Sequence, residues 1–136
     1  MVKAIINPAN LNRPRGYAHG VRTEGERLLF LAGQMGVDAS GQIAAPNDLV
    51  AQFAQALSNL ITVVEEARGQ RTDIVKLTIY ITDRAAYLSN LKPLGEAYQM
   101  VLGGYYPAMT LVEVKSLLDE EAVVEIDGMA VIEESS

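Results

Sequence analysis

The clearest pattern along the chain is a helical repeat of apolar residues between positions 47 and 68. The repeat consists of Leu49, Val50, Phe53, Leu57, Leu60, Ile61 and Val64. Spacings of three and four residues place these side chains on one face of a helix, so we predict an amphipathic helix over residues 47–68. Asn47 is the expected N-terminal cap, and Gly69 lies where a helix commonly stops.

A second helical repeat covers residues 83–102. Its apolar positions are Tyr87, Leu88, Leu91, Leu94, Tyr98, Val101 and Leu102. Pro93 falls inside this segment, and proline lacks the N–H group that a helix interior requires. We therefore expect a short turn that ends near Asn90, followed by a helix that begins near Pro93 and stops at Gly103 and Gly104.

Residues 73–82 show the alternation of a strand with one covered face. Ile74, Val75, Leu77, Ile79 and Ile81 are apolar, whereas Lys76, Thr78 and Tyr80 are interleaved with them. Further strands are predicted at residues 2–6, 17–23, 27–34, 108–114 and 122–132. Strand–helix–strand units need crossover connections, so we expect an α+β fold whose six-stranded sheet is mixed.

Two helices can cover only one face of such a sheet. On the other face, uncharged side chains such as Tyr80 and Met129 occupy alternating positions. A sheet face of this kind either meets solvent or packs on another subunit. We favour the second arrangement and predict an oligomer.

The amino-acid composition excludes several kinds of active site and binding partner. The chain of 136 residues has no Cys and one His, and we read residues 1–136 as a single domain. This excludes thiol catalysis, thiolate metal sites and a three-histidine zinc site within one subunit. A net charge of −6 argues against nucleic-acid binding by bulk charge. No apolar run approaches the ~20 residues of a membrane helix, and no signal peptide is evident, so we expect a soluble cytoplasmic protein with no membrane partner.

Two carboxylates are candidates for chemistry in the last predicted strand. Glu125 and Asp127 alternate there and so share one face. They are either solvated, or one of them is a general base or a water-positioning group at a subunit boundary. Glu113, on a neighbouring predicted strand, is an alternative for the exposed or paired role.

The N-terminal region holds the other candidates. Tyr17 and His19 lie in a glycine-flanked segment, where they are either loop residues or part of a cleft. Arg13, Arg15 and Arg22 form the only local basic cluster. This cluster either holds an anion such as a substrate carboxylate or is simply solvated.

Six segments together resemble one family over nearly the whole chain. They are residues 16–21 (GYAHGV), 29–34 (LFLAGQ), 52–60 (QFAQALSNL), 73–83 (DIVKLTIYITD), 107–114 (PAMTLVEV) and 124–127 (VEID). In this order and spacing they resemble the Rid family, also called YjgF or endoribonuclease L-PSP-like. The resemblance implies a chorismate-mutase-like fold and a homotrimer with a cleft between each pair of subunits. Family deaminases hydrolyse enamine and imine intermediates to 2-keto acids without a metal or organic cofactor.

The resemblance also implies roles for individual residues. Glu125 matches the acidic residue that positions water, Tyr17 matches a tyrosine of the cleft, and Gly33 matches a backbone group near the substrate. Met109 stands where the family has the arginine that binds the substrate carboxylate. The loss of such a charged hydrogen bond is worth ~1.5–3 kcal/mol.

Two further departures concern positively charged or titratable groups. Lys92 replaces a family asparagine, and His19 replaces a family glutamine. We therefore take Glu125 and His19 as catalytic candidates. The substrate-binding candidates are Tyr17, Gly33, Lys92 and Met109, with Lys92 as a possible replacement for the lost charge.

These departures leave several functions open. The first is a homotrimer that acts on a small metabolite other than a standard 2-imino acid. The second is a non-catalytic metabolite-binding or regulatory trimer, and the third is an enamine or imine deaminase with an altered substrate. An endoribonuclease or translation inhibitor is the least favoured, because of the net charge of −6 and the lack of a basic stripe. No cofactor or metal is implied.

Overall fold

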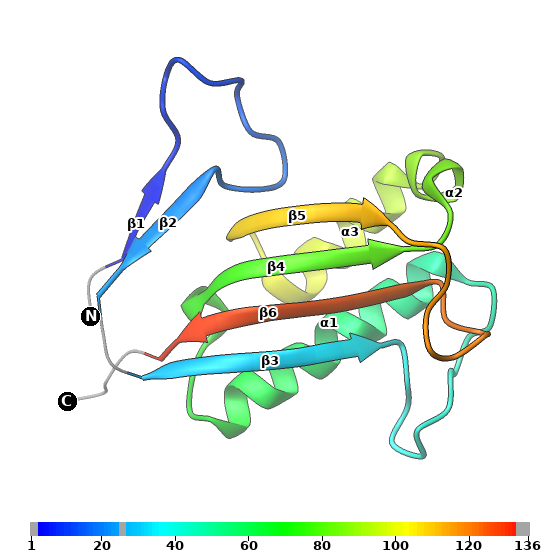
Figure 1. Ribbon diagram of the computed structural model, residues 1–136. Coiled ribbons are helices and arrows are strands. Elements are labelled where there is room, and N and C mark those ends of the chain that lie inside the picture. The colour runs from blue at the N-terminus through cyan, green and yellow to red at the C-terminus, as the bar shows by residue number, and fades with distance from the viewer. Residues whose placement is uncertain (1–2, 25–26, 133–136) are drawn as a thin grey trace.

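The computed structural model describes residues 3–24 and 27–132 (Figure 1). The strands are β1 (Lys3–Ile6), β2 (Gly20–Thr23), β3 (Leu28–Met35), β4 (Ile74–Ile81), β5 (Ala108–Glu113) and β6 (Val124–Val131). The helices are α1 (Leu49–Glu66), a 3-10 turn η1 (Arg71–Asp73), the short α2 (Arg84–Leu88) and α3 (Leu91–Leu102). The first residue of the strand predicted at 2–6 lies outside the described residues.

The main sheet is mixed, as predicted, with the strand order β3-β6-β4-β5. β4 and β5 are parallel, whereas β6 is antiparallel to both β3 and β4. In the parallel pair Leu77 lies opposite Met109, and in the antiparallel pair Tyr80 lies opposite Glu125. These two registers decide which face of the sheet each candidate side chain occupies.

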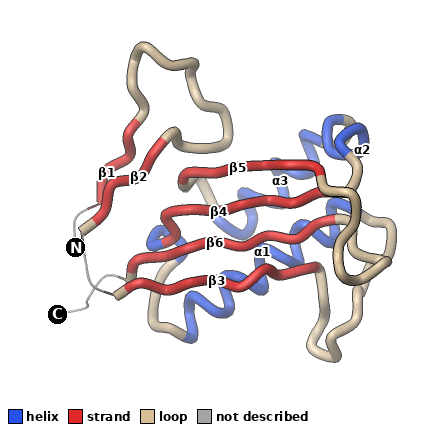
Figure 2. The backbone as a smooth tube through the Cα atoms, viewed as in Figure 1, coloured by secondary structure: helices blue, strands red, loops and turns tan. Residues whose placement is uncertain are grey.

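The prediction of one six-stranded sheet is wrong, because β1 and β2 pair with each other in a separate two-stranded ribbon (Figure 2). The backbone groups of β1 are paired with those of β2, with Lys3 opposite Thr23 and Ile6 opposite Gly20. The second strand begins at Gly20, where the pairing with β1 starts, rather than at residue 17. A single parallel bridge joins Ala18 to Ala108 at the edge of β5, where the Ala18 N–H donates to the Pro107 carbonyl at 2.9 Å.

The ends of α1 differ in detail from the prediction. Asp48 is the N-cap, and its side chain accepts a hydrogen bond from the Ala51 N–H at 3.0 Å. Asn47 instead has a φ of 62° in the preceding turn. After the helix, Arg68 takes the left-handed conformation, with a φ of 66°. Gly69 follows it, and a Cβ there would overlap Ile132.

Pro93 divides the second helical region as predicted. Asp83 caps α2 through a hydrogen bond from the Ala86 N–H at 3.0 Å, and α3 begins at Leu91. Pro93 is therefore in the first turn of α3, where N–H groups have no partner within the helix. Gly103 ends α3 with a φ of 67°.

The helices cover one face of the four-stranded sheet (Figure 1). The core lies between them, and Leu57, Leu60, Leu77, Ile126 and Leu102 are almost completely buried in it. We call the other face, where the side chains of Lys76, Thr78 and Tyr80 lie, the open face. None of the described helices is both long and apolar enough to cross a membrane.

Candidate functional site

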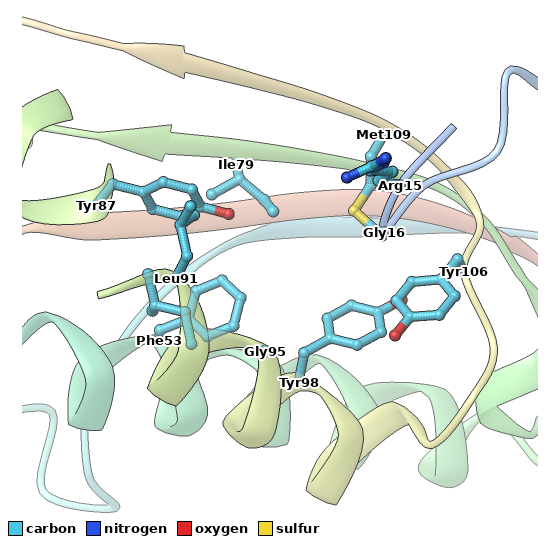
Figure 3. Close-up of a pocket in the computed structure, with 11 residues that line it drawn as sticks. Arg15, Gly16, Phe53, Ile79, Tyr87, Leu91, Gly95, Tyr98, Tyr106 and Met109 are labelled. Atoms are coloured by element: carbon cyan, nitrogen blue, oxygen red, sulfur yellow. The ribbon is translucent and has the colours of Figure 1, made fainter. Parts of the chain in front are cut away.

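Two adjoining cavities lie between the edge of the sheet at β5 and the helices α2 and α3. Their volumes are about 240 and 400 Å³. Figure 3 shows the residues that line the smaller one. Both are lined by Arg15, Gly16, Ile79, Tyr87, Leu91 and Met109. The inner one also contacts Phe53, Leu94, Gly95, Tyr98 and Tyr106, and the outer one Tyr17 and Leu111. These volumes fall around the lower limit for small-molecule sites, which is roughly 300 Å³.

Met109 forms an apolar part of the wall from the sheet side. It lies opposite Leu77, whose side chain is fully buried under the helices, so Met109 shares the helix-covered face with it. Its side chain is half-buried and reaches the cavity. A thioether offers only a weak hydrogen-bond acceptor here, and no charge.

Three tyrosines give the cavity polar groups. The rings of Tyr98 and Tyr106 stack with centroids 4.9 Å apart and planes 4° from parallel. The Tyr98 hydroxyl is occupied, because it donates to the Tyr105 carbonyl at 2.7 Å, and burial raises the pKa of Tyr98. Burial also raises the pKa of Tyr87, whose hydroxyl points into the cavity (Figure 3). Tyr87 therefore remains a neutral donor at physiological pH.

The segment that carries Tyr17 and His19 forms the outer rim. The Tyr17 hydroxyl accepts a hydrogen bond from the Asn12 side-chain amide at 3.0 Å, and its ring meets His19 edge-on at 5.3 Å. The His19 Nε2 lies 2.7 Å from the Asn12 carbonyl oxygen. Because a carbonyl can only accept, Nε2 carries the hydrogen and is not a free base. His19 supports Tyr17 but does not line either cavity.

Glu125 and Gly33 lie next to each other, away from the cavities. A Cβ at Gly33 would overlap the Glu125 carboxylate, and a register shift interrupts the β3–β6 ladder between Leu31 and Gln34. Glu125 lies opposite Tyr80 and so points to the open face. Met109 and Glu125 are thus on opposite faces of the sheet within one subunit.

Asp127 continues this polar row on the open face. The Tyr80 hydroxyl donates to its carboxylate at 3.2 Å. The negative charge of Asp127 raises the pKa of Tyr80, with smaller contributions from burial and from Glu125. A Lys76–Thr110 hydrogen bond of 2.6 Å adds a further polar pair to the same face.

The remaining candidates have other positions. Lys92 is exposed on α3 and lines neither cavity. Glu113 accepts a hydrogen bond from the Arg84 N–H at 2.9 Å, at the first residue of α2, which is a structural role. The three arginines do not form one cluster in the structure. Arg15 lines the two cavities, and Arg13 lines a separate hollow on the surface. Arg22 is exposed on β2.

Sequence reasoning missed most of the cavity wall. Tyr87, Leu91 and Tyr98 were identified only as members of a helical repeat, which is how a buried face looks in a sequence. Gly95 was not singled out, although the space in front of its Cα is open. Within the part of the chain that the structure describes, no three His, Asp or Glu side chains are close enough to hold a metal ion.

Comparison with known proteins assigns the chain to a family. The sequence profile described as endoribonuclease L-PSP matches residues 9–132. The chain belongs to this family, which includes the Rid and YjgF proteins. A RutC family protein of Pyrococcus horikoshii is 29% identical over 130 residues, which cover 95% of this chain and 98% of the relative. The family resemblance predicted from the six segments is therefore confirmed.

Two further relatives are a named deaminase and a protein of known structure but unknown function. A 2-iminobutanoate/2-iminopropanoate deaminase of Capra hircus is 29% identical over 133 residues, covering 96% of this chain and 91% of the relative. The crystal structure of the Rid family protein YyfB of Yersinia pestis, a protein of unknown function, has a TM-score of 0.87 at 29% identity. The match covers 97% of this chain and 100% of YyfB. The YjgF-like α+β fold of this chain is thus shared with YyfB.

Proposed function

We propose that this chain binds a small metabolite in the cavities beside β5 and is not a standard 2-imino acid deaminase. The observation that carries the proposal is Met109 on the cavity wall, at the position where the resemblance to the Rid family implies a carboxylate-binding arginine. An uncharged thioether cannot make the bidentate contact of a guanidinium. The aromatic and aliphatic lining instead suits a ligand with an apolar body.

The proposed assembly is a homotrimer in which other protomers cover the open face. Phe30 supports this arrangement, because its side chain is 69% exposed opposite Met129 on that face. Light scattering of the wild type should give the mass of three protomers, and Phe30→Glu should give that of one. Met100→Glu is the matched control, since Met100 is 86% exposed on α3, in the helix layer. A wild-type mass of one protomer would refute the trimer.

The proposed trimer also bears on whether the site is catalytic. Within one protomer Met109 and Glu125 lie on opposite faces of the sheet, so an active site that uses both must be built from two protomers. In that case Glu125 from a neighbour would activate water for a ligand held in the cavity. Glu125→Gln should then abolish turnover while it leaves ligand binding nearly unchanged.

A retained deaminase activity is the second candidate, favoured by the relatives named 2-iminobutanoate/2-iminopropanoate deaminase. The test is keto-acid release from 2-iminobutanoate generated in situ by an amino-acid oxidase. We expect no acceleration over buffer, with the goat deaminase as the positive control. Acceleration by the wild type would overturn our proposal in favour of this candidate.

Met109→Arg tests whether the missing arginine is the cause. The variant should acquire measurable hydrolysis of 2-iminobutanoate, because it returns a carboxylate-binding group to the wall. Leu111→Arg is the control, since Leu111 is two residues further along the same strand and also contacts the outer cavity. An inert Met109→Arg of unchanged mass would show that more than this one residue separates the chain from the deaminases.

A further inference from the structure

The only charged side chain among the described residues that line the two cavities is Arg15. Its guanidinium lies beside Met109 in Figure 3, although the two residues come from distant parts of the sequence. No hydrogen bond or ion pair joins this guanidinium to another of the described residues. Considering residues 3–24 and 27–132, Arg15 is thus an exposed cation without a charged partner at the edge of a mostly apolar cavity.

The position of Arg15 follows from the path of the chain. The bridge between Ala18 and Ala108 fixes the preceding residues across the edge of β5. Arg13, two residues earlier, lines a different hollow together with Asn7 and Pro8. Lys92 contacts neither cavity. The positive charge at the cavities thus depends on one side chain.

A guanidinium in this setting selects for an anion. Its planar array of N–H donors matches both oxygens of a carboxylate, and such charge-assisted, two-point contacts are stronger than neutral hydrogen bonds. The whole chain carries a net charge of −6, so an unpaired arginine at a cavity is a local exception. The Tyr87 hydroxyl, which points into the same space, has no hydrogen-bond partner among the described residues and supplies a neutral donor.

The rest of the wall defines the body of the ligand. Ile79, Leu91 and Met109 are apolar, and the stacked rings of Tyr98 and Tyr106 flank the inner cavity. A cavity of about 150 Å³ accommodates benzene. Volumes of about 240 and 400 Å³ therefore admit a single ring or a branched chain with a short acidic arm.

We propose that Arg15 is the anion anchor of this site and that the ligand is a small monocarboxylate with an aromatic or branched aliphatic body. This inference rests on the proposed function, because it names the ligand class of the same cavities. It differs from the sequence-based expectation that Lys92 replaces the missing positive charge. The anchor comes from the N-terminal loop rather than from α3 or from β5.

Calorimetric titration of the full chain with phenylacetate and phenylacetamide tests the anchor. The two probes have nearly the same shape and differ in charge. The wild type should bind phenylacetate at least tenfold more tightly than phenylacetamide. Arg15→Gln should weaken phenylacetate binding at least tenfold and change phenylacetamide binding less than twofold. Arg13→Gln, which removes the same charge from the same loop, should leave both affinities unchanged.

Gly95→Phe tests the cavity independently of the anchor. A Cβ at Gly95 has open space before it, so the added ring enters the inner cavity without a clash at its base. It should weaken the binding of both probes, with an unfolding curve close to that of the wild type.

The outcomes separate the two proposals. Equal wild-type affinity for both probes, or unchanged phenylacetate binding in Arg15→Gln, overturns the anchor but leaves the cavity site standing if Gly95→Phe still blocks binding. Unchanged binding in Gly95→Phe shows that the probes bind elsewhere and overturns both proposals. A folded wild type that binds neither probe overturns the ligand class.

Discussion

Gln52 offers the sharpest test of how this fold is held together near the site. Its side chain is 1% exposed on α1 and makes three hydrogen bonds to the backbone. The amide donates to the Ala45 carbonyl at 2.9 Å and to the Glu121 carbonyl at 3.0 Å. Its oxygen accepts from the Val123 N–H at 2.9 Å. Gln52 thereby joins the start of α1 to the connection that leads into β6 and Glu125.

Gln52→Met removes these bonds with little change in side-chain length. Each bond contributes about 0.5–1.5 kcal/mol net, and a buried polar group left without a partner adds to the cost. The methionine recovers part of this through apolar burial. We therefore expect the free energy of unfolding to fall by about 2–4 kcal/mol, a large part of the ~5–15 kcal/mol typical of a domain.

Urea denaturation at one fixed protomer concentration measures this change, with an m-value close to that of the wild type. Gln55→Met is the control, because the Gln55 amide on the same helix donates only to the Asn59 side chain, at 2.8 Å. Its loss should cost less than about 1 kcal/mol. Equal effects of the two substitutions would refute the assignment of the stabilisation to the three backbone bonds.

Three further predictions concern stability. Gly95→Ala should stabilise the protein by about 0.5–1 kcal/mol in thermal unfolding, because Gly95 is inside α3 and a Cβ there would meet no other atom within 4 Å. A lower melting temperature would contradict this. Gly128→Ala should destabilise by about 1–3 kcal/mol or more in urea, because a Cβ would overlap the Lys76 carbonyl in the middle of the sheet; a neutral effect would show that β4 and β6 can separate locally. Burial, with a smaller effect of Asp73, raises the pKa of Tyr105 to about 12, so its neutral form is favoured in the folded state. Stability should therefore be intact below about pH 10 and decline as the pH rises through about 12, and Tyr105→Phe should remove this part of the decline in alkaline unfolding curves.

The parts of the fold that local patterns determine were predictable. The repeat from Leu49 to Val64 gave α1 within two residues at each end, and Pro93 correctly divided α2 from α3. The choice of Asp48 over Asn47 as the cap was not accessible, because adjacent Asn and Asp are comparable caps and only the turn geometry separates them. Local sequence patterns thus predicted where these helices lie, but not each residue at which they begin and end.

The arrangement of the site required long-range information. Met109 and Glu125 are placed on opposite faces by the registers of β5 and β6 against β4, which no local pattern encodes. Arg15 reaches the cavities only because the bridge at Ala18 lays its loop across β5. One of three similar arginines was therefore distinguished by the path of the backbone, not by its neighbours in the sequence.

The separate β1–β2 ribbon has a consequence for the kinetics of ligand entry. A two-stranded ribbon of four-residue strands is marginally stable by itself, and a cation–π contact from Lys3 to Tyr105 at 5.0 Å is one of its links to the rest of the fold. The amides of this ribbon should exchange with deuterium well before those of β4. The connection between β1 and β2 carries Arg15 and Tyr17. Local opening of the ribbon would therefore widen the cavity rim without global unfolding. The rate of ligand exchange would then follow the opening rate of the ribbon rather than diffusion.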